Sequence, residues 1–144
     1  MSYSNTPIYS SDTTESRQSI LCSTDTKVKA LIIEDEVDIC YLLKGILRYK
    51  NIDADYVTSL SDAEIALRES APPIVFLDNH LQDGLGVNYI SKVKKKFPDT
   101  KVIMITAHDT QADRDKAFAE GVDLFIGKPF TREVITKAIE KVTL

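Results

Sequence analysis

Short runs of apolar residues recur along the chain, and one further run alternates between apolar and polar residues. The continuous runs cover residues 30–33, 74–77, 102–105 and 124–126. Continuous apolar runs are typical of strands that are covered on both faces, as in a parallel sheet. Residues 52–57 alternate instead, so one face of this strand is expected to meet water, and its two aspartates suit the edge of a sheet.

The segments between these runs carry apolar side chains at helical spacing. Apolar stripes predict helices over residues 39–47, 87–97 and 134–142. Ser61-Asp62-Ala63-Glu64 is a capping-box pattern and predicts that a helix begins there and covers Ala63–Glu69. A less regular helix is expected over residues 111–120, with Gly121 as its stop. Strands and helices therefore alternate five times.

This alternation predicts an α/β fold around one parallel sheet. Crossovers between parallel strands are right-handed and place helices on both faces of the sheet. With the alternating strand at an edge, the expected strand order is 2-1-3-4-5, a doubly wound, flavodoxin-like (βα)5 arrangement. In this topology a ligand crevice lies where strands 1 and 3 end side by side, so chemistry is expected at the carboxyl ends of the strands.

Charged and hydroxyl side chains follow four of the predicted strands. The strand ends are Glu34-Asp35-Glu36, Asp78, Thr106-Ala107-His108 and Lys128-Pro129. Three carboxylates in one crevice repel each other unless a cation joins them, and a hard ion such as Mg²⁺ (or Mn²⁺) suits oxygen ligands. A nucleophilic Asp78, a metal, Lys128 and the Thr106 hydroxyl would together serve in-line phosphoryl transfer.

From Lys27 to Leu144 the chain resembles the receiver domain of bacterial two-component systems. Four motifs carry the resemblance in the family's order and spacing: Leu31-Ile32-Ile33-Glu34-Asp35, Val75-Phe76-Leu77-Asp78, Met104-Ile105-Thr106-Ala107 and Gly127-Lys128-Pro129-Phe130. The resemblance implies that Asp78 is the phosphoacceptor and that Glu34, Asp35, Asp78 and the backbone carbonyl of His80 hold the metal. It also implies that Thr106 and Lys128 contact the phosphoryl group, that Phe125 is the family's aromatic switch, and that the Lys128-Pro129 peptide is cis.

Two positions depart from the family's pattern. Gln82 stands where the family usually has proline, and Gly84 and Gly86 are expected to supply the turn instead. Glu34 replaces the more frequent aspartate, and its extra methylene would let the carboxylate reach a metal through water.

The only two histidines, His80 and His108, stand two residues beyond Asp78 and Thr106. In the receiver family, side chains at these positions influence how fast water removes the phosphoryl group. We therefore hypothesise that His80 and His108 tune the lifetime of the phosphorylated state. The alternative is that both are exposed loop histidines without such a role.

Composition and charge narrow the function classes. The net charge of −4 gives no general attraction to nucleic acid or to an anionic membrane, and no segment approaches the roughly 18 apolar residues of a membrane span. A cytoplasmic protein with Cys40 as a buried reduced thiol is expected. Residues 1–26 hold twelve Ser or Thr, so a flexible tail is expected before a receiver domain over residues 27–144. The negative end of a helix dipole is the preferred explanation of the lysine cluster, and a docking patch is the alternative; the cluster is Lys92, Lys94, Lys95 and Lys96.

The resemblance implies a signalling switch rather than an enzyme, with Mg²⁺-dependent self-phosphorylation and autodephosphorylation only. A histidine kinase or phosphotransfer protein would supply the phosphoryl group. A downstream protein would read the face formed by the fourth helix, fifth strand and fifth helix. We expect no output domain after the fifth helix, which ends close to Leu144. The chain is therefore expected to bind a target protein or to relay the phosphoryl group onward.

Other functions stay open, as does the oligomeric state. One is a receiver-like binding module that never accepts phosphate, and another is the receiver half of a longer DNA-binding regulator. A metal-dependent aspartyl phosphatase is disfavoured, because Asp78-Asn79-His80 lacks a second acid and follows the third strand rather than the first.

Overall fold

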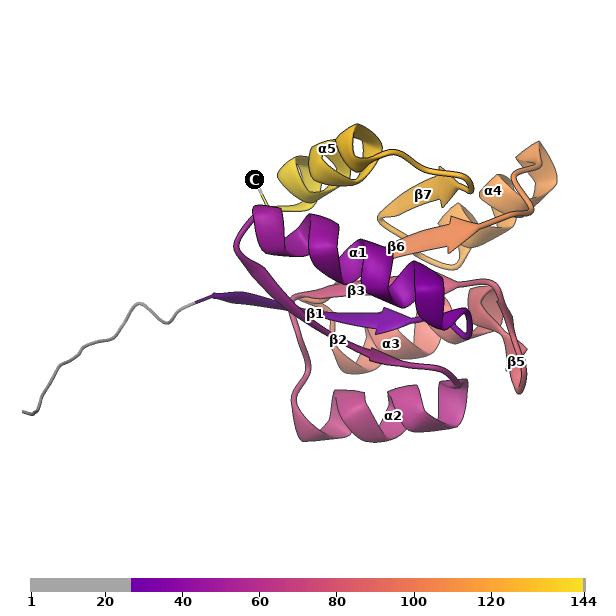
Figure 1. Cartoon of the computed structure of the whole chain (residues 1–144). Coiled ribbons are helices and arrows are strands. Elements are labelled where there is room, and N and C mark those ends of the chain that lie inside the picture. The colour runs from indigo at the N-terminus through magenta and orange to yellow at the C-terminus, as the bar shows by residue number, and fades with distance from the viewer. Residues whose placement is uncertain (1–26, 144) are drawn as a thin grey trace, which may run out of the picture.

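The computed structural model describes residues 27–143, in which helices cover both faces of a central sheet (Figure 1). The strands of the sheet are β1 (Val28–Ile33), β2 (Ile52–Val57), β3 (Ile74–Asp78), β6 (Lys101–Thr106) and β7 (Leu124–Gly127). All of their pairings are parallel, in the order β2-β1-β3-β6-β7. The predicted fold and strand order are therefore confirmed. The predicted flexible tail, residues 1–26, lies outside the described residues.

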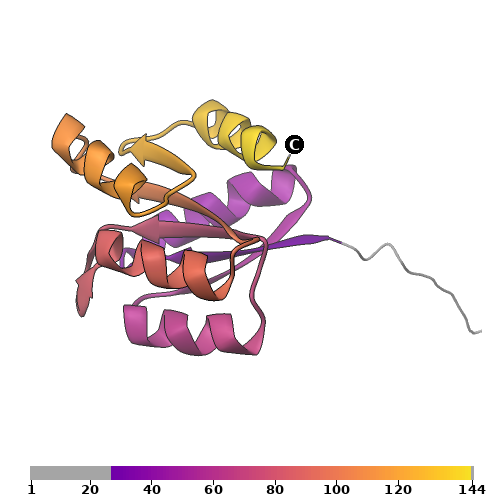
Figure 2. The same cartoon turned by 180° about the vertical axis from the view of Figure 1, so that it is seen from behind.

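Two layers of helices flank the sheet, as Figure 2 shows from behind. One layer contains α1 (Val37–Tyr49) and α5 (Arg132–Val142), and the other contains α2 (Leu60–Glu69), α3 (Ile90–Lys96) and α4 (Gln111–Ala119). Successive strand residues point to opposite layers. Ile32 and Phe76 pack with the first layer, whereas Ile33 and Leu77 pack with the second. This double burial explains why the central strands are apolar at consecutive positions.

Helix α2 begins earlier than the sequence predicts. Its first residue is Leu60, and the side chain of Ser59, rather than that of Ser61, caps it by accepting a hydrogen bond from the backbone N–H of Asp62. Ser61 instead donates its backbone N–H and its hydroxyl to the carboxylate of Asp83. The capping-box prediction at Ser61 was wrong because the helix begins at Leu60, which places Ser61 inside the first turn, and its side chain is directed to Asp83 from a distant loop.

A short hairpin after β3 was not predicted from the sequence. Strands β4 (His80–Leu81) and β5 (Gly84–Leu85) pair antiparallel, and a 3-10 helix, η3 (Gly86–Tyr89), leads into α3. Gly84 has a φ of 149°, a conformation that side chains disfavour, so this glycine supplies the turn after Gln82. Asp83 ties the hairpin to α2 through the backbone N–H groups of Leu60 and Ser61.

Cys40 lies on α1 and is fully buried, as predicted for a structural thiol. Its Sγ donates to the carbonyl oxygen of Glu34 at 3.3 Å. Burial raises the pKa of the thiol to about 11, so the group stays protonated at neutral pH. Among residues 27–143, none of the helices combines the length and the apolar character that a membrane span requires.

Candidate functional site

The carboxyl ends of four parallel strands bring the candidate residues to one end of the sheet. Ile33 pairs with Leu77, so Glu34 and Asp78 follow at neighbouring positions on β1 and β3. Asp78 pairs with Ile105, the residue before Thr106. Thr106 pairs with Gly127, the residue before Lys128. The register of the parallel strands therefore brings residues that are far apart in the sequence to neighbouring positions at one end of the sheet.

Three acidic side chains converge at this end of the sheet. Glu34, Asp35 and Asp78 each offer a carboxylate oxygen, and these atoms lie within 4.8 Å of one another. Glu34 is 2% exposed and Asp78 is 6% exposed. Burial raises the pKa of Glu34 to about 7, and the charge of Asp78 adds to the rise. Burial also raises the pKa of Asp78, with a contribution from Asp35.

This donor set fits the expected divalent ion. Mg²⁺ takes one or two carboxylates, tolerates carbonyl and water oxygens, and relieves repulsion among neighbouring acids. Both oxygens of Glu34 already have protein partners, because Oε1 faces Lys128 and Oε2 accepts from the backbone N–H of Glu36 at 3.1 Å. Asp35 and Asp78 are therefore the carboxylates best placed for direct ligation, with Glu34 suited to contact through water.

Lys128 lies against the acids, and its nearest partner is Glu34 rather than Asp78. Its Nζ is 2.8 Å from Glu34 Oε1, 3.4 Å from Glu36 Oε1 and 3.6 Å from Asp78 Oδ1. Burial by itself lowers the pKa of Lys128, but the hydrogen bond with Glu34 and the charge of Asp78 raise the pKa above its ordinary value. The ammonium therefore stays charged. The Lys128-Pro129 peptide is cis, as the resemblance implied.

Thr106 is fully buried at the end of β6. Its Oγ1 accepts from the backbone N–H of His108 at 3.1 Å, and its carbonyl oxygen accepts from the backbone N–H of Lys128 at 2.8 Å. Phe125 is also buried, on β7, and the guanidinium of Arg114 lies 4.9 Å from its ring centroid. Thr106 thus ends the strand that pairs with β3, one residue beyond the partner of Asp78, while Phe125 packs in the core on the side of α2, α3 and α4.

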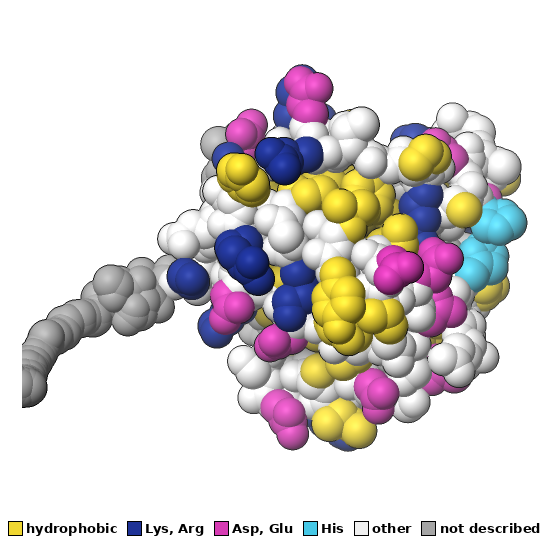
Figure 3. Space-filling model, in the orientation of Figure 1, with side chains coloured by type: hydrophobic (Ala, Val, Ile, Leu, Met, Phe, Trp, Pro, Cys, Tyr) yellow, Lys and Arg dark blue, Asp and Glu magenta, His cyan; other side chains and the backbone are white. Residues whose placement is uncertain are grey.

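His80 and His108 contact each other, which the sequence did not predict. Their ring centroids are 4.2 Å apart with an interplanar angle of 39°. Both residues are exposed, and Figure 3 shows them together at the surface beside a group of acidic side chains. His80 begins β4 two residues after Asp78, and His108 stands two residues after Thr106, so the pair lies just beyond the strand ends that carry the candidate site.

Sequence reasoning missed Asn79. This residue is buried, its Oδ1 accepts from the backbone N–H of Val87 at 2.9 Å, and its carbonyl oxygen accepts from Gly86 at 2.7 Å. A Cβ at Gly86 would collide with the backbone carbonyl oxygen of Asp78. Asn79 and Gly86 therefore hold the loop that carries the carbonyl of His80. An asparagine after a strand suggests only a turn, so no local signal marks it.

Comparison with known proteins gives consistent matches. A family model described as the response regulator receiver domain matches residues 30–140. The chain is 30% identical over 108 residues to the probable transcriptional regulatory protein TcrX of Mycobacterium tuberculosis, covering 75% of this chain and 46% of that protein. It is 29% identical over 106 residues to the phosphate regulon transcriptional regulatory protein PhoB of Rhizobium meliloti, covering 72% and 46%.

A solved structure extends the match to three dimensions. The receiver domain of NtrX from Brucella abortus is 31% identical with a TM-score of 0.73, covering 78% of this chain and 96% of that one. The chain spans about half the length of the curated relatives it matches, 46% in both cases.

Magnesium chloride is expected to raise the thermal unfolding midpoint of the metal-free protein, because the ion relieves carboxylate repulsion only in the folded state. At a concentration of 100 times Kd, binding to the folded state alone adds about 2.7 kcal/mol to the free energy of unfolding. Differential scanning fluorimetry measures the shift. The Asp35→Asn variant should lose most of this shift in the unfolding midpoint. The control is Asp53→Asn, which replaces an exposed carboxylate on β2 that pairs with Lys29, and this variant should keep the shift. An equal shift in both variants would contradict a site at Asp35.

Proposed function

Because this chain belongs to the response-regulator receiver domain family of two-component systems, we propose that it is a switch controlled by phosphorylation of Asp78. The observation that carries this proposal is the convergence of Glu34, Asp35 and Asp78 within 4.8 Å, with Lys128 beside them. A histidine kinase or a phosphotransfer protein would be the phosphoryl donor, and a downstream protein would be the target.

Each residue of the site has a role in the proposed transfer. Asp35, Asp78 and the backbone carbonyl of His80 would hold Mg²⁺ (or Mn²⁺), with Glu34 assisting through water, and the ion would neutralise charge on the phosphoryl oxygens. A carboxylate oxygen of Asp78 attacks phosphorus, and the bond from phosphorus to the donor's nitrogen or oxygen breaks. The leaving group keeps the electron pair of that bond, and Asp78 becomes an acyl phosphate.

Lys128 and Thr106 would stabilise the product. The raised pKa of Lys128 keeps its ammonium charged, so it can pair with a phosphoryl oxygen once the charge of Asp78 is reduced. The Thr106 hydroxyl accepts from His108, and its hydrogen is available to donate to a phosphoryl oxygen. Both groups come from strand ends fixed by the sheet, so little reorganisation is needed at the moment of transfer.

The signal would leave the site through the face formed by α4, β7 and α5. Movement of Thr106 toward the phosphoryl group alters the packing around β7, where Phe125 is buried under Arg114. Two packings of such a face can differ by a few kcal/mol, so differential interaction with the phosphoryl group shifts their populations. Phe125 is the proposed aromatic switch, and the altered face is the proposed surface for the downstream protein.

Incubation with MgCl2 and acetyl phosphate is expected to add the mass of one phosphoryl group, measured by intact-protein mass spectrometry. Asp78→Asn should gain none, since an amide cannot form the acyl phosphate, and wild type with EDTA should gain little. Slow spontaneous loss of the group is expected. Phosphorylation of Asp78→Asn would refute the assignment, and rapid multiple-turnover release of phosphate would favour an aspartyl phosphatase.

Thr106→Ala is expected to be phosphorylated on Asp78 but to lose the response of the output face. The carboxylate chemistry is intact in this variant, whereas the hydroxyl that couples the phosphoryl group to β7 is gone. Hydrogen exchange of α4 and β7, with and without acetyl phosphate, measures the response. Thr136→Ala on α5, which removes an exposed hydroxyl, is the matched control and should respond like wild type. A full response in Thr106→Ala would contradict the coupling.

We also propose that His80 and His108 tune the lifetime of the acyl phosphate. A neutral imidazole can orient the water that attacks phosphorus. The double variant His80→Ala with His108→Ala is therefore expected to lose the phosphoryl group at least a few-fold more slowly, as measured by the decay of the phosphorylated mass after removal of acetyl phosphate. Identical decay rates in wild type and double variant would leave the histidines without this role.

A further inference from the structure

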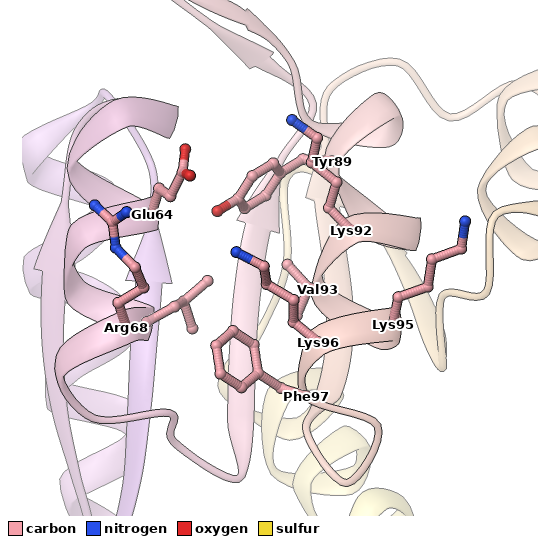
Figure 4. A pocket seen from close by; sticks show the side chains of 9 residues that line it. Glu64, Arg68, Tyr89, Lys92, Val93, Lys95, Lys96 and Phe97 are labelled. Carbon is pink, nitrogen blue, oxygen red and sulfur yellow. The ribbon is translucent and has the colours of Figure 1, made fainter.

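A groove between α2 and α3 contains none of the site residues described above. It encloses about 250 Å³, and its floor is apolar, made by Leu67 from α2 and by Val93 and Phe97 from α3 and its end (Figure 4). Leu67 and Val93 are nearly fully buried. The groove lies on the side of the sheet that α1 and α5 do not cover.

Cations surround this apolar floor. Arg68 stands on the α2 wall, and Lys92 and Lys96, one helical turn apart on α3, stand on the other, where Lys96 extends toward the gap (Figure 4). Among residues 27–143, none of these three side chains makes an ion pair within 4 Å. Glu64 is the one acid among the lining residues. A chain of net charge −4 therefore presents a locally positive groove.

The lysines of α3 do not all behave alike. Lys94 donates to the carboxylate of Asp123 and to the carbonyl oxygen of Thr100, both at 2.8 Å, and so ties α3 to the sheet. Lys92 and Lys96 stay exposed at the groove, and Lys95 is also exposed but extends away from it (Figure 4). The negative end of the helix accounts for lysines near the last turn in general, but it does not account for their arrangement around an apolar floor.

Tyr89 is the second indication of a ligand. The residue is 9% exposed, and its phenol oxygen points into the groove (Figure 4). Its hydroxyl makes no side-chain hydrogen bond with any other residue of the described part of the chain. A tyrosine with a buried ring and a polar tip that faces a groove can donate its hydroxyl to a bound partner, which is why tyrosine is common at binding interfaces. An acceptor supplied from outside would satisfy this hydroxyl.

We propose that the α2–α3 groove binds an acidic segment of a partner protein that carries one apolar side chain. The apolar side chain would occupy the cavity, flanking carboxylates would pair with Arg68, Lys92 and Lys96, and Tyr89 would donate to a carbonyl or carboxylate oxygen. The cavity is smaller than the roughly 300–1,000 Å³ of pockets that enclose a whole small-molecule ligand, so it suits a single side chain. Cations distributed over two helices match charges spaced along a peptide. Binding here does not require Asp78 or Mg²⁺.

The probe is a fluorescein-labelled peptide, Asp-Glu-Asp-Phe-Glu-Asp-Glu, titrated with the full chain at low salt without Mg²⁺ or phosphoryl donor. Fluorescence anisotropy should show binding at least roughly tenfold tighter than that of the same peptide with central alanine. A peptide with lysines in place of its acids should not bind. In ¹H–¹⁵N spectra the largest shifts should lie at Tyr89, Lys92, Lys96 and Phe97.

Matched variants separate specific docking from general attraction. Lys92→Glu with Lys96→Glu should weaken binding by roughly tenfold or more. Lys137→Glu with Lys141→Glu makes the same charge change at the same spacing on α5 and should leave affinity within about twofold. Tyr89→Phe removes one hydrogen bond and should weaken binding roughly 3–10-fold at an unchanged thermal midpoint.

Several results would overturn the proposal. One such result is that the peptide with a central phenylalanine binds no more tightly than the peptide with a central alanine or the peptide with lysines in place of its acids. Another is equal loss of affinity in the α3 and α5 double variants. If 4-phenylbutyrate displaces the peptide and binds the chain as tightly as the peptide does, the groove is instead a site for small anions. Sedimentation showing a dimer that Lys92→Glu with Lys96→Glu dissociates would identify a second copy as the occupant. The Asp78→Asn variant should bind the peptide with the affinity of wild type. A failure of the groove proposal can therefore be distinguished from a failure of the phosphorylation proposal.

Discussion

The buried carboxylates at the carboxyl ends of β1 and β3 carry more negative charge than the single neighbouring ammonium of Lys128 can neutralise. Glu34 and Asp78 are both nearly inaccessible, and Asp35 brings a third carboxylate within 4.8 Å of them. Removing charges from water is costly unless each finds a partner, and the raised pKa values of Glu34 and Asp78 express this cost. This imbalance is the physical basis of the proposed switch, in which a hard cation would neutralise the acids and a phosphoryl group would then find positive partners.

The rest of the domain holds this unfavourable arrangement in place. Strand β3 is buried along its whole length, so the position of Asp78 is fixed by packing on both faces of the sheet. The loop that follows is anchored at two points, because Asp83 joins the hairpin to α2 and Asn79 accepts hydrogen bonds from Gly86 and Val87. A rigid sheet and an anchored loop allow the site to be preorganised at the expense of local stability.

The same chain uses its cations in two different ways. Lys128 and Lys94 are partly buried and each pairs with an acid, which fixes a strand end or a helix. Arg68, Lys92 and Lys96 instead surround an apolar floor without ion pairs among the described residues, and their field is felt only locally because salt screens exposed charges beyond about 8–10 Å. An acidic protein can therefore offer a docking groove for an acidic partner, at a surface separate from the acidic cluster at the strand ends.

The pattern of residues along the chain was enough to predict the alternation of strands and helices, the edge position of β2 and the strand order. It also predicted that the strand ends carrying Glu34, Asp35, Asp78, Thr106 and Lys128 lie at one end of the sheet. These follow from local periodicity and from the handedness of crossovers, which a single chain encodes. Three other features became visible only in the folded chain: Ser59 rather than Ser61 caps α2, Lys128 lies nearest to Glu34, and His80 contacts His108. The folded chain also places Tyr89 at a groove of cations. Each of these depends on side-chain directions and on contacts between segments distant in sequence, which a one-dimensional pattern does not specify.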